Sequence, residues 1–307
     1  MAETIYNLFV YTDGKIITHL GIEQYKIVDD PTEEAMIEFL KERALNDHET
    51  AYKAAIVKPT VTLDAYQAKQ RVGTAFVMFE QLFALAKAPQ NPLFVATMIE
   101  NGVPRVDYSH HGDGPVNLSN INGSRMIDYL FHYISEEGFD LPRLIDDDYF
   151  KAIKLLFNNR HYVSCTKLMM IFIDTMAFIE YGDVKNKNIF SDWLNTYAPL
   201  DEINITESEL WEFRNGVIHM SNLHSRKVRE GSVAQLVPGV NVPSSSITMP
   251  DGRKRLDLMG LVNVLGKAIN NWADTYNKDF LKFEKFVERY DTIVSDARLS
   301  YEDIHST

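Results

Sequence analysis

The sequence has a single cysteine, Cys165, among its 307 residues. One thiol excludes a disulfide within the chain and a zinc site built from cysteines. The first residues, MAETIYNLFVYTDGK, place an acid at position 3 and have no basic stretch before an apolar segment, so no secretory signal is expected. Charged residues interrupt the apolar segments, and no run is expected to approach the length of a membrane span. These absences favour a cytoplasmic protein that does not cross a membrane.

Positive charge is also scarce. The chain has 31 Lys and Arg against 43 Asp and Glu, which gives a net charge of −12. Because phosphate binding needs neutralising cations, this balance argues against a protein that coats nucleic acid non-specifically. It leaves room for a small local basic site. Hydrophobic residues make up 45% of the chain, which is enough for a core in one large or two ordinary domains.

The first half of the chain alternates between strand-like and helical patterns. Strand-like runs flank Asp13-Gly14 and again Asn101-Gly102, and both dipeptides are strong hairpin signals. Helices are expected over 30–46 and 63–88, and a strand with an edge-type proline over 54–63. Hairpins interleaved with helices predict an α+β domain with an antiparallel sheet over residues 1–115. The sequence does not indicate the role of this domain.

A stretch rich in Gly, Ser and Asn, residues 109–124, predicts a linker, and the pattern after it is almost wholly helical. The expected helices are 125–138, 148–162, 164–182, 188–198, 205–220, and one long or two broken helices over 256–290. Thr206 stands three residues before Glu209, which is the spacing of a capping box. A small β-hairpin is expected around Asp251-Gly252. Residues 116–307 therefore predict an all-α helical bundle with an inserted β-hairpin.

The segment ELWEFRNGVIHM, residues 209–220, places a charged side chain beside an apolar stripe. The stripe consists of Leu210, Phe213 and Val217. The residues on roughly the opposite face are Glu212, Asn215 and His219. Arg214 lies about 40° from the centre of the stripe, and on an ideal helix it points about 140° away from His219. The spacing alone therefore does not place Arg214 and His219 in one site.

A helical bundle that carries an arginine, four further residues and then a histidine resembles the HEPN superfamily, which occurs in prokaryotic toxins, defence systems and RNA-processing factors. The resemblance rests on Arg214, Asn215 and His219 and extends over roughly residues 120–295, without the N-terminal half. Some toxin members carry a tyrosine two residues after the histidine, where this chain has Ser221. Regulation through that tyrosine is therefore not implied.

This resemblance implies a HEPN-like helical domain that forms a homodimer and cleaves RNA without a metal, in a cleft shared at the two-fold axis. It also implies a place in a prokaryotic defence or toxin system, where a protein partner or antitoxin is expected. In such a dimer, Arg214, which lies beside the apolar stripe, would face the partner chain.

The residue types suit RNA cleavage. Histidine exchanges protons near neutral pH, so His219 can take the proton from a ribose 2′-hydroxyl that attacks the adjacent phosphate. The Arg214 guanidinium can hold two phosphate oxygens, and Asn215 can orient either group. The products would be a 2′,3′-cyclic phosphate and a 5′-hydroxyl, and no cofactor is expected. The candidate RNA-binding residues that follow the motif are His224, Arg226, Lys227 and Arg229.

Simpler interpretations stay open for each of these residues. Arg214 could form a structural ion pair with a buried acid such as Asp174, and His219 could be an ordinary surface histidine. The basic run after the motif, and the second one from Arg253 to Arg255, could be solvated loops. The helical half would then be a non-catalytic HEPN-like module that binds a partner or RNA without cutting it.

Two further stretches favour other functions less well. SHHGDG places His110, His111 and Asp113 close together, as a metal hydrolase would need. Adjacent histidines cannot easily turn to one ion, however, and no third ligand is evident, so no metal site is predicted. The three acids from Asp146 to Asp148 precede a helical pattern and are expected to cap its N-terminus.

Overall fold

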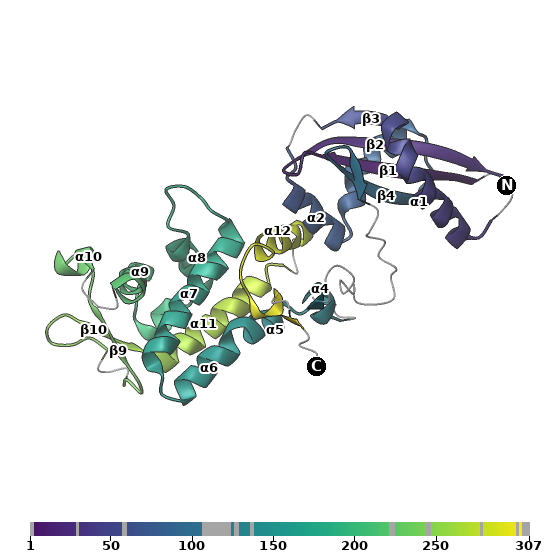
Figure 1. Ribbon diagram of the computed structural model, residues 1–307. Coiled ribbons are helices and arrows are strands. Elements are labelled where there is room, and N and C mark those ends of the chain that lie inside the picture. The colour runs from purple at the N-terminus through teal and green to yellow at the C-terminus, as the bar shows by residue number, and fades with distance from the viewer. Residues whose placement is uncertain are drawn as a thin grey trace. The chain divides into compact units, whose positions relative to one another are not determined.

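Figure 1 shows the computed structural model of the chain, which describes residues 3–28, 31–56, 60–105, 124–125, 129–135, 138–220, 225–243, 247–276, 279–298 and 301–302. The chain separates into two compact units, Met1–Gly114 and Pro115–Thr307. The first unit contains a mixed sheet with helices, and the second is mostly helical. The coarse prediction, a sheet-containing first half and a helical second half, is confirmed.

The sheet of the first unit has five strands in the order β3-β2-β1-β4-β5. Their bounds are Glu3–Thr12 (β1), Ile17–Ile27 (β2), Tyr52–Ala55 (β3), Leu93–Glu100 (β4) and Val103–Arg105 (β5). The two predicted hairpins, β1–β2 and β4–β5, are confirmed. The prediction of an antiparallel sheet is wrong at its centre, where β1 and β4 run parallel. A parallel pair needs a crossover, which the helices between β3 and β4 provide.

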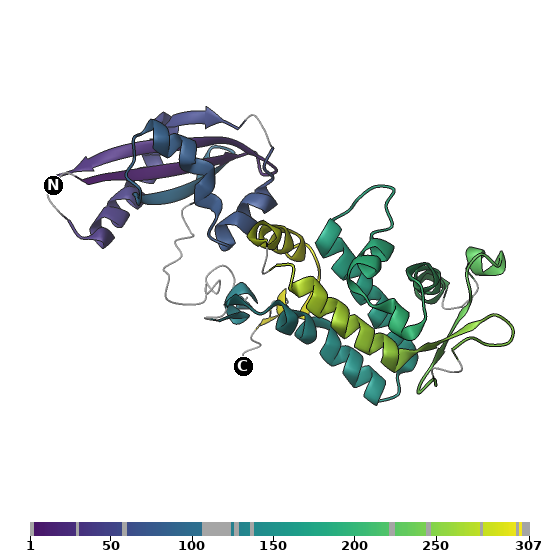
Figure 2. The same cartoon turned by 180° about the vertical axis from the view of Figure 1, so that it is seen from behind.

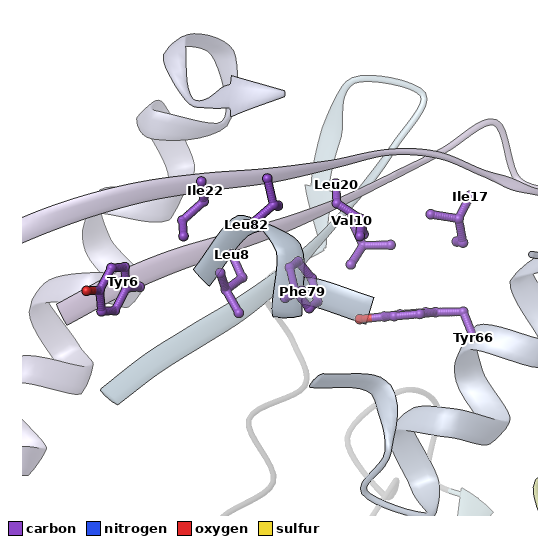
Figure 3. Close-up of a cluster of buried hydrophobic side chains, with 9 residues drawn as sticks. All are labelled: Tyr6, Leu8, Val10, Ile17, Leu20, Ile22, Tyr66, Phe79 and Leu82. Atoms are coloured by element: carbon purple, nitrogen blue, oxygen red, sulfur yellow. The ribbon is translucent and has the colours of Figure 1, made fainter. Parts of the chain in front are cut away.

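Helices cover both faces of the central strand β1, as Figures 1 and 2 show from opposite sides. On one face, Ile5 and Phe9 belong to clusters that include Leu40 and Ala44 of α1 (Glu33–Thr50). The cluster on the other face contains Tyr6, Leu8, Val10, Ile17, Leu20, Ile22, Tyr66, Phe79 and Leu82 (Figure 3). Successive side chains of a strand point to opposite faces, so a strand with two covered faces is buried at consecutive positions.

The helix predicted over residues 63–88 is broken into three pieces. They are α2 (Leu63–Arg71), the 3₁₀ turn η1 (Ala75–Phe79) and α3 (Glu80–Leu85). Gly73 stands after α2 with φ +78, a left-handed conformation that ends a helix. The strand predicted over 54–63 begins earlier, as β3, and Pro59 lies outside the described residues.

The second unit is built around α7 (Tyr162–Tyr181), which ends before Gly182 as predicted. The helices around it are α5 (Leu141–Ile145), α6 (Lys151–Asn158), α8 (Ile189–Tyr197), α9 (Glu207–Asn215), α11 (Leu258–Ala273) and α12 (Phe280–Tyr290). The helices α6, α8, α11 and α12 all contact α7. Met169, Phe172, Ile173 and Met176 of α7 are fully buried. The helices predicted over 164–182 and 188–198 are therefore confirmed, and the closing pattern forms two helices.

The helix α7 departs from the prediction that no apolar run approaches the length of a membrane span. It is the one helix in the described part of the chain that has the length and composition to cross a membrane, and about half of it is buried inside the unit. Its buried side chains pack against neighbouring helices, as those of a core helix do.

The acids Asp146, Asp147 and Asp148 do not cap a helix as predicted. The helix begins earlier, with Asp140 capping α5, and the acids lie in a π-helical turn, η3 (Asp146–Phe150), that joins α5 to α6. The hydroxyl of Tyr133 donates to Asp147 at 2.8 Å, and that of Tyr290 donates to Asp148. Burial raises the pKa of Asp148, whereas the hydrogen bond from Lys151 lowers the pKa of Asp147. These acids therefore join helices rather than cap one.

Of two smaller predictions for the second unit, one is wrong and one is confirmed. The helix expected over 125–138 is the short α4 (Tyr129–His132), followed by the antiparallel pair β7 (Ile134–Ser135) and β8 (Gly138–Phe139). The hairpin around Asp251-Gly252 is present, with an antiparallel bridge from Thr248 to Lys254 and a hydrogen bond from the Arg255 amide to the Ile247 carbonyl at 2.7 Å. Its second arm, β10 (Lys254–Asp257), also pairs parallel with β9 (Leu236–Gly239). The inserted segment is thus held mainly by a strand that precedes the turn.

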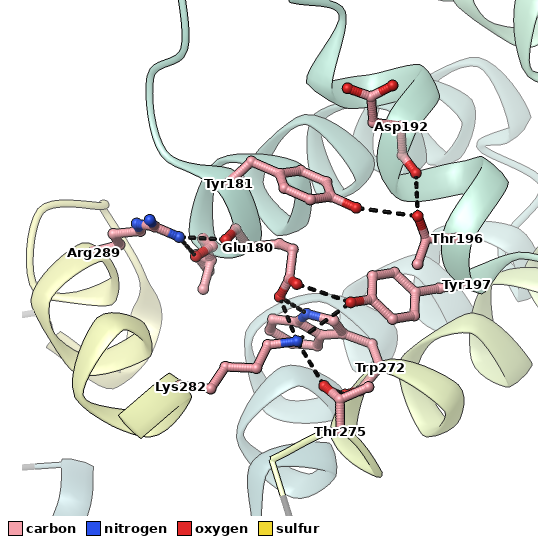
Figure 4. A network of polar contacts seen from close by, with 10 residues as sticks. Glu180, Tyr181, Asp192, Thr196, Tyr197, Trp272, Thr275, Lys282 and Arg289 are labelled. Atoms are coloured by element: carbon pink, nitrogen blue, oxygen red, sulfur yellow. Dashed lines mark hydrogen bonds and ion pairs between the residues drawn. The ribbon is translucent and has the colours of Figure 1, made fainter. Parts of the chain in front are cut away.

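A buried polar network ties α12 to the rest of the helical unit (Figure 4). Glu180 of α7 accepts hydrogen bonds from the Trp272 indole at 2.7 Å and the Tyr197 hydroxyl at 2.8 Å, and it pairs with Lys282 at 2.8 Å. Lys282 also donates to Thr275 at 2.6 Å. The side chains of Lys282 and Glu180 are only 18% and 11% exposed, so each charge depends on the other for compensation.

Lys282→Ala is expected to lower the free energy of unfolding by about 3 kcal/mol, because it leaves the Glu180 carboxylate buried without its cation. The matched control is Lys285→Ala on the same helix, which breaks only a more exposed pair with Glu288 and should change stability by less than about 1 kcal/mol. Urea denaturation of the three proteins measures both effects. Equal losses in the two variants would mean that the network contributes no more than a surface ion pair.

Candidate functional site

The helix α9 positions the Arg-Asn-Gly-Val-Ile-His motif. It begins with the predicted capping box, in which the Thr206 side chain accepts from the Glu209 amide and the Glu209 carboxylate accepts from the Thr206 amide. Leu210 and Phe213 are buried as the apolar stripe predicts. After Asn215 the backbone changes to a π-helical turn, η5 (Gly216–Met220). A helical pattern over 205–220 is therefore confirmed, but its second part does not have α-helical geometry.

The π-turn brings Arg214 and His219 together within one chain. An i→i+5 backbone register places a residue close above the one five positions earlier, whereas an α-helix would turn the two apart. The guanidinium Nη1 of Arg214 lies 2.8 Å from Nε2 of His219 and donates at 3.1 Å to Oδ1 of Asn215. The expectation that Arg214 and His219 diverge is therefore wrong, because it assumed an ideal α-helix.

Asp174 of α7 holds the other side of Arg214. Its Oδ2 accepts from Nε at 2.9 Å and from Nη2 at 2.7 Å, so the predicted ion pair is present. The guanidinium also lies over the Trp211 ring, 5.2 Å from its centroid, which is a cation–π contact. Burial raises the pKa of Asp174, and the hydrogen bond and charge of Arg214 oppose that rise. Arg214 is thus fixed by Asp174 and Trp211, with Nη1 directed at Asn215 and His219.

The contact with Arg214 also identifies the tautomer of His219. An arginine side chain can only donate hydrogen bonds, so Nε2 of His219 accepts and the ring proton lies on Nδ1. His219 is exposed, in agreement with its position on the polar face of the predicted helix. Its Nε2 is the atom closest to the guanidinium and the one suited to accept a proton from a nearby hydroxyl.

A pocket of about 350 Å³ opens beside this motif. It is lined by Glu212, Asn215, His219, Ser225, Arg226 and Lys227. Arg226 and Lys227 come from α10 (Arg226–Arg229), which Figures 1 and 2 show beside α9. The pocket therefore joins two of the three predicted catalytic residues with two of the four predicted RNA-binding residues. Arg229 is exposed on α10 away from the pocket lining, and His224 lies outside the described residues.

Two further residues that line this pocket, Glu212 and Ser225, were not among the predicted site residues. Glu212 shares a helix face with Asn215 and His219, and this spacing was the available signal. Ser225 is buried and its hydroxyl accepts from the amide of Val228 at 3.4 Å, which caps α10. Nothing in its sequence context distinguishes that serine from an ordinary loop residue.

Carboxylates balance much of the positive charge near the pocket. Lys227 Nζ lies 3.4 Å from Glu212 Oε1, and Arg226 Nε lies 3.7 Å from Glu230 Oε1. Two cations of the second basic run are also paired, since Arg253 contacts Asp251 at 2.6 Å and Lys254 contacts Glu209 at 2.8 Å. The local basic surface is consequently small, and any phosphate would have to compete with these carboxylates.

No group of three His, Cys, Asp or Glu side chains is arranged to hold a metal ion within the described ranges. His110, His111 and Asp113, along with Ser221, lie outside those ranges. Comparison of the chain with known protein families, with curated proteins and with solved structures gives no match.

Proposed function

We propose that the second unit is a HEPN-like domain and that the protein is a metal-independent endoribonuclease, acting as a homodimer in a prokaryotic defence or toxin system. One observation supports the activity above all. Arg214 lies within hydrogen-bonding distance of both Asn215 and His219, beside a pocket that also contains Arg226 and Lys227. Cleavage of RNA by its own 2′-hydroxyl needs a proton acceptor and a cation beside the phosphate, which His219 and Nη1 of Arg214 can supply, and Asn215 can orient either group.

In the proposed reaction, Nε2 of His219 takes the proton of the 2′-hydroxyl as the oxygen attacks phosphorus. The bond from phosphorus to the 5′-oxygen breaks, and His219 returns the proton to that oxygen. Nη1 of Arg214 moves from His219 to a phosphate oxygen and stabilises the added negative charge. Asp174 holds Nε and Nη2 throughout, so the guanidinium keeps its orientation. The products are a 2′,3′-cyclic phosphate and a 5′-hydroxyl.

Exposed apolar side chains support the proposed homodimer. Val163 and Ile171 of α7 are 70% and 46% exposed, and they lie on the same helix as Asp174. Leu155 of the adjoining α6 is 64% exposed. These side chains are available for contact with a second chain. Because Arg214 and His219 already meet within one chain, a dimer would contain two complete sets of these residues.

The activity is tested by incubating the purified chain with total RNA in the presence of EDTA. We expect cleavage that EDTA does not slow, and fragments with 2′,3′-cyclic phosphate and 5′-hydroxyl ends. Cleavage that stops on chelation would contradict the mechanism, and fragments with 3′-hydroxyl ends would assign the chemistry to a different site. An intact RNA pool across pH and salt conditions would remove the nuclease proposal.

One observation favours a second candidate, a HEPN-like module that binds a partner or RNA without cutting. Arg214 already contacts Asp174, Asn215, His219 and Trp211, as a purely structural arginine would. In this case filter binding would detect RNA or a partner, Arg214→Ala would lower stability, and RNA would remain uncut.

A further inference from the structure

Glu212 has an unusual environment for a carboxylate. It is only 7% exposed, yet it lines the pocket beside Asn215 and His219. In the part of the chain that the structure describes, its side chain has one partner, Lys227, whose Nζ lies 3.4 Å from Oε1. A carboxylate has about four acceptor positions, and a buried one normally uses them. Because Glu212 lines the pocket, its carboxylate can accept hydrogen bonds from a molecule bound there.

The position of Glu212 suits contact with the nucleotide that would be cleaved. Glu212 precedes His219 by seven residues, the last four of which lie in the π-turn, and both side chains line the same pocket. The 2′-hydroxyl and the base are attached to the same ribose, so both groups of one bound nucleotide can occupy one pocket. The pocket volume of about 350 Å³ falls within the range of small-molecule sites, about 300 to 1,000 Å³. A base attached to the attacking ribose can therefore reach Glu212 when His219 contacts the 2′-hydroxyl.

From this geometry we propose that Glu212 and Lys227 read the base of the cleaved nucleotide and select guanine, an inference that rests on the proposed nuclease function. The Watson–Crick edge of guanine presents one acceptor, O6, beside two donors, N1–H and N2–H. The Lys227 ammonium donates to O6, and the two Glu212 oxygens accept from N1–H and N2–H. Single-stranded RNA exposes this edge, and side chains commonly recognise it there.

The other three bases complement this pair less well. Uracil places its one donor, N3–H, between two carbonyl oxygens, so one oxygen of Glu212 would face a carbonyl. Adenine and cytosine each offer one amino donor to Glu212 and one ring nitrogen to Lys227. Guanine alone satisfies the ammonium and both carboxylate oxygens. Because a bidentate contact to a base is worth about 10- to 100-fold in discrimination, guanosine should be the preferred nucleotide and uridine the poorest.

A purely structural role for the pair would be to fasten α10 to α9. A second buried acid on the same helix provides the matched control. Glu209 is also 7% exposed and pairs with Lys254 at 2.8 Å, but it does not belong to the described residues that line the pocket. Glu209→Gln keeps the capping box, which accepts either residue. It perturbs a comparable ion pair without touching the pocket.

The test uses four oligodeoxynucleotides that differ only in one ribonucleotide, with guanine, adenine, cytosine or uracil as its base. Only that position has a 2′-hydroxyl, so the cleavage site is fixed. We expect wild-type chain to cleave the guanosine substrate on the order of 10- to 100-fold faster than the uridine substrate. Glu212→Gln should lower this ratio at least tenfold, since glutamine presents a donor to the base, and Glu209→Gln should leave the ratio unchanged.

Lys227→Ala provides a second variant, in which the substituted side chain is itself 46% exposed. It should also lower the guanosine-to-uridine ratio, through loss of the donor to O6. Equal cleavage of the four substrates by wild-type chain, or a ratio that Glu212→Gln leaves unchanged, would overturn guanine selection while the nuclease proposal stands. If the wild-type chain cleaved neither the four substrates nor total RNA, both the guanine selection and the nuclease proposal would be overturned.

Discussion

Replacing His219 with alanine is expected to slow RNA cleavage by about 10² to 10⁴-fold, because the variant loses the group that carries the proton from the 2′-oxygen to the 5′-oxygen. The fold should be retained, since the ring is exposed and its described contact is with Arg214. Initial rates on a labelled oligoribonucleotide and thermal unfolding of both proteins separate loss of chemistry from loss of structure.

His161 provides the control for this substitution. It is an exposed histidine in the same unit, located just before α7 and outside the described lining of the pocket. His161→Ala should cleave RNA at the wild-type rate. If His219→Ala cleaves as fast as His161→Ala, then the motif is coincidental and the nuclease activity belongs to other residues.

Local sequence signals predicted most of the individual elements. Asp13-Gly14 and Asn101-Gly102 sit at turns whose strands pair directly, so short-range chemistry was enough to predict the hairpins. The capping box at Thr206 and the glycine end of α7 were readable for the same reason. The parallel pairing of β1 with β4 depends instead on a long crossover, and no local pattern encodes which strand a chain will join.

Helix interruptions account for most of the errors. The apolar period continues through Gly73, so periodicity alone suggested one long helix where the structure has three pieces. The acids from Asp146 to Asp148 resemble an N-terminal cap. The helical segment has already begun before them, however, at α5, which Asp140 caps and which carries Pro142 in its first turn. Periodicity reports which face is buried, and it does not report the hydrogen-bond register of the backbone.

The same limit explains the candidate site. The residue types at Arg214 and His219 suggested a shared function, while an ideal α-helix required them to diverge and led to the idea of a cleft completed by a second chain. The π-turn that begins at Gly216 removes that requirement. Gly216 was the local signal, since glycine is unfavourable within a regular helix, but a kink and a close contact would give the same signal.

Arg214→Lys is expected to reduce cleavage by on the order of 10² to 10³-fold although it keeps the positive charge. A single ammonium cannot hold Asp174 through two nitrogens and also reach Asn215 and His219 as the guanidinium does. Stability should change little, because the charge of Asp174 remains compensated. Arg214→Ala should lose activity and also about 2 kcal/mol of unfolding free energy, since a mostly buried carboxylate then has no cation. Wild-type activity in Arg214→Lys would show that the fork geometry is not used.

Mixing the two inactive variants decides whether the site belongs to one chain or to two. Arg214→Ala and His219→Ala chains, unfolded and refolded together, form heterodimers in which each chain lacks one member of the pair. Since the structure places Nη1 of Arg214 at 2.8 Å from Nε2 of the His219 in the same chain, no such dimer contains a complete site, and activity should stay at the level of the separate variants. The control is wild-type chain mixed with the chain that carries both substitutions, where each heterodimer retains one complete site and remains active. Recovery of activity in the first mixture would mean that the cleft takes its arginine and its histidine from different chains, and the contact within one chain would then represent a resting arrangement that substrate binding breaks.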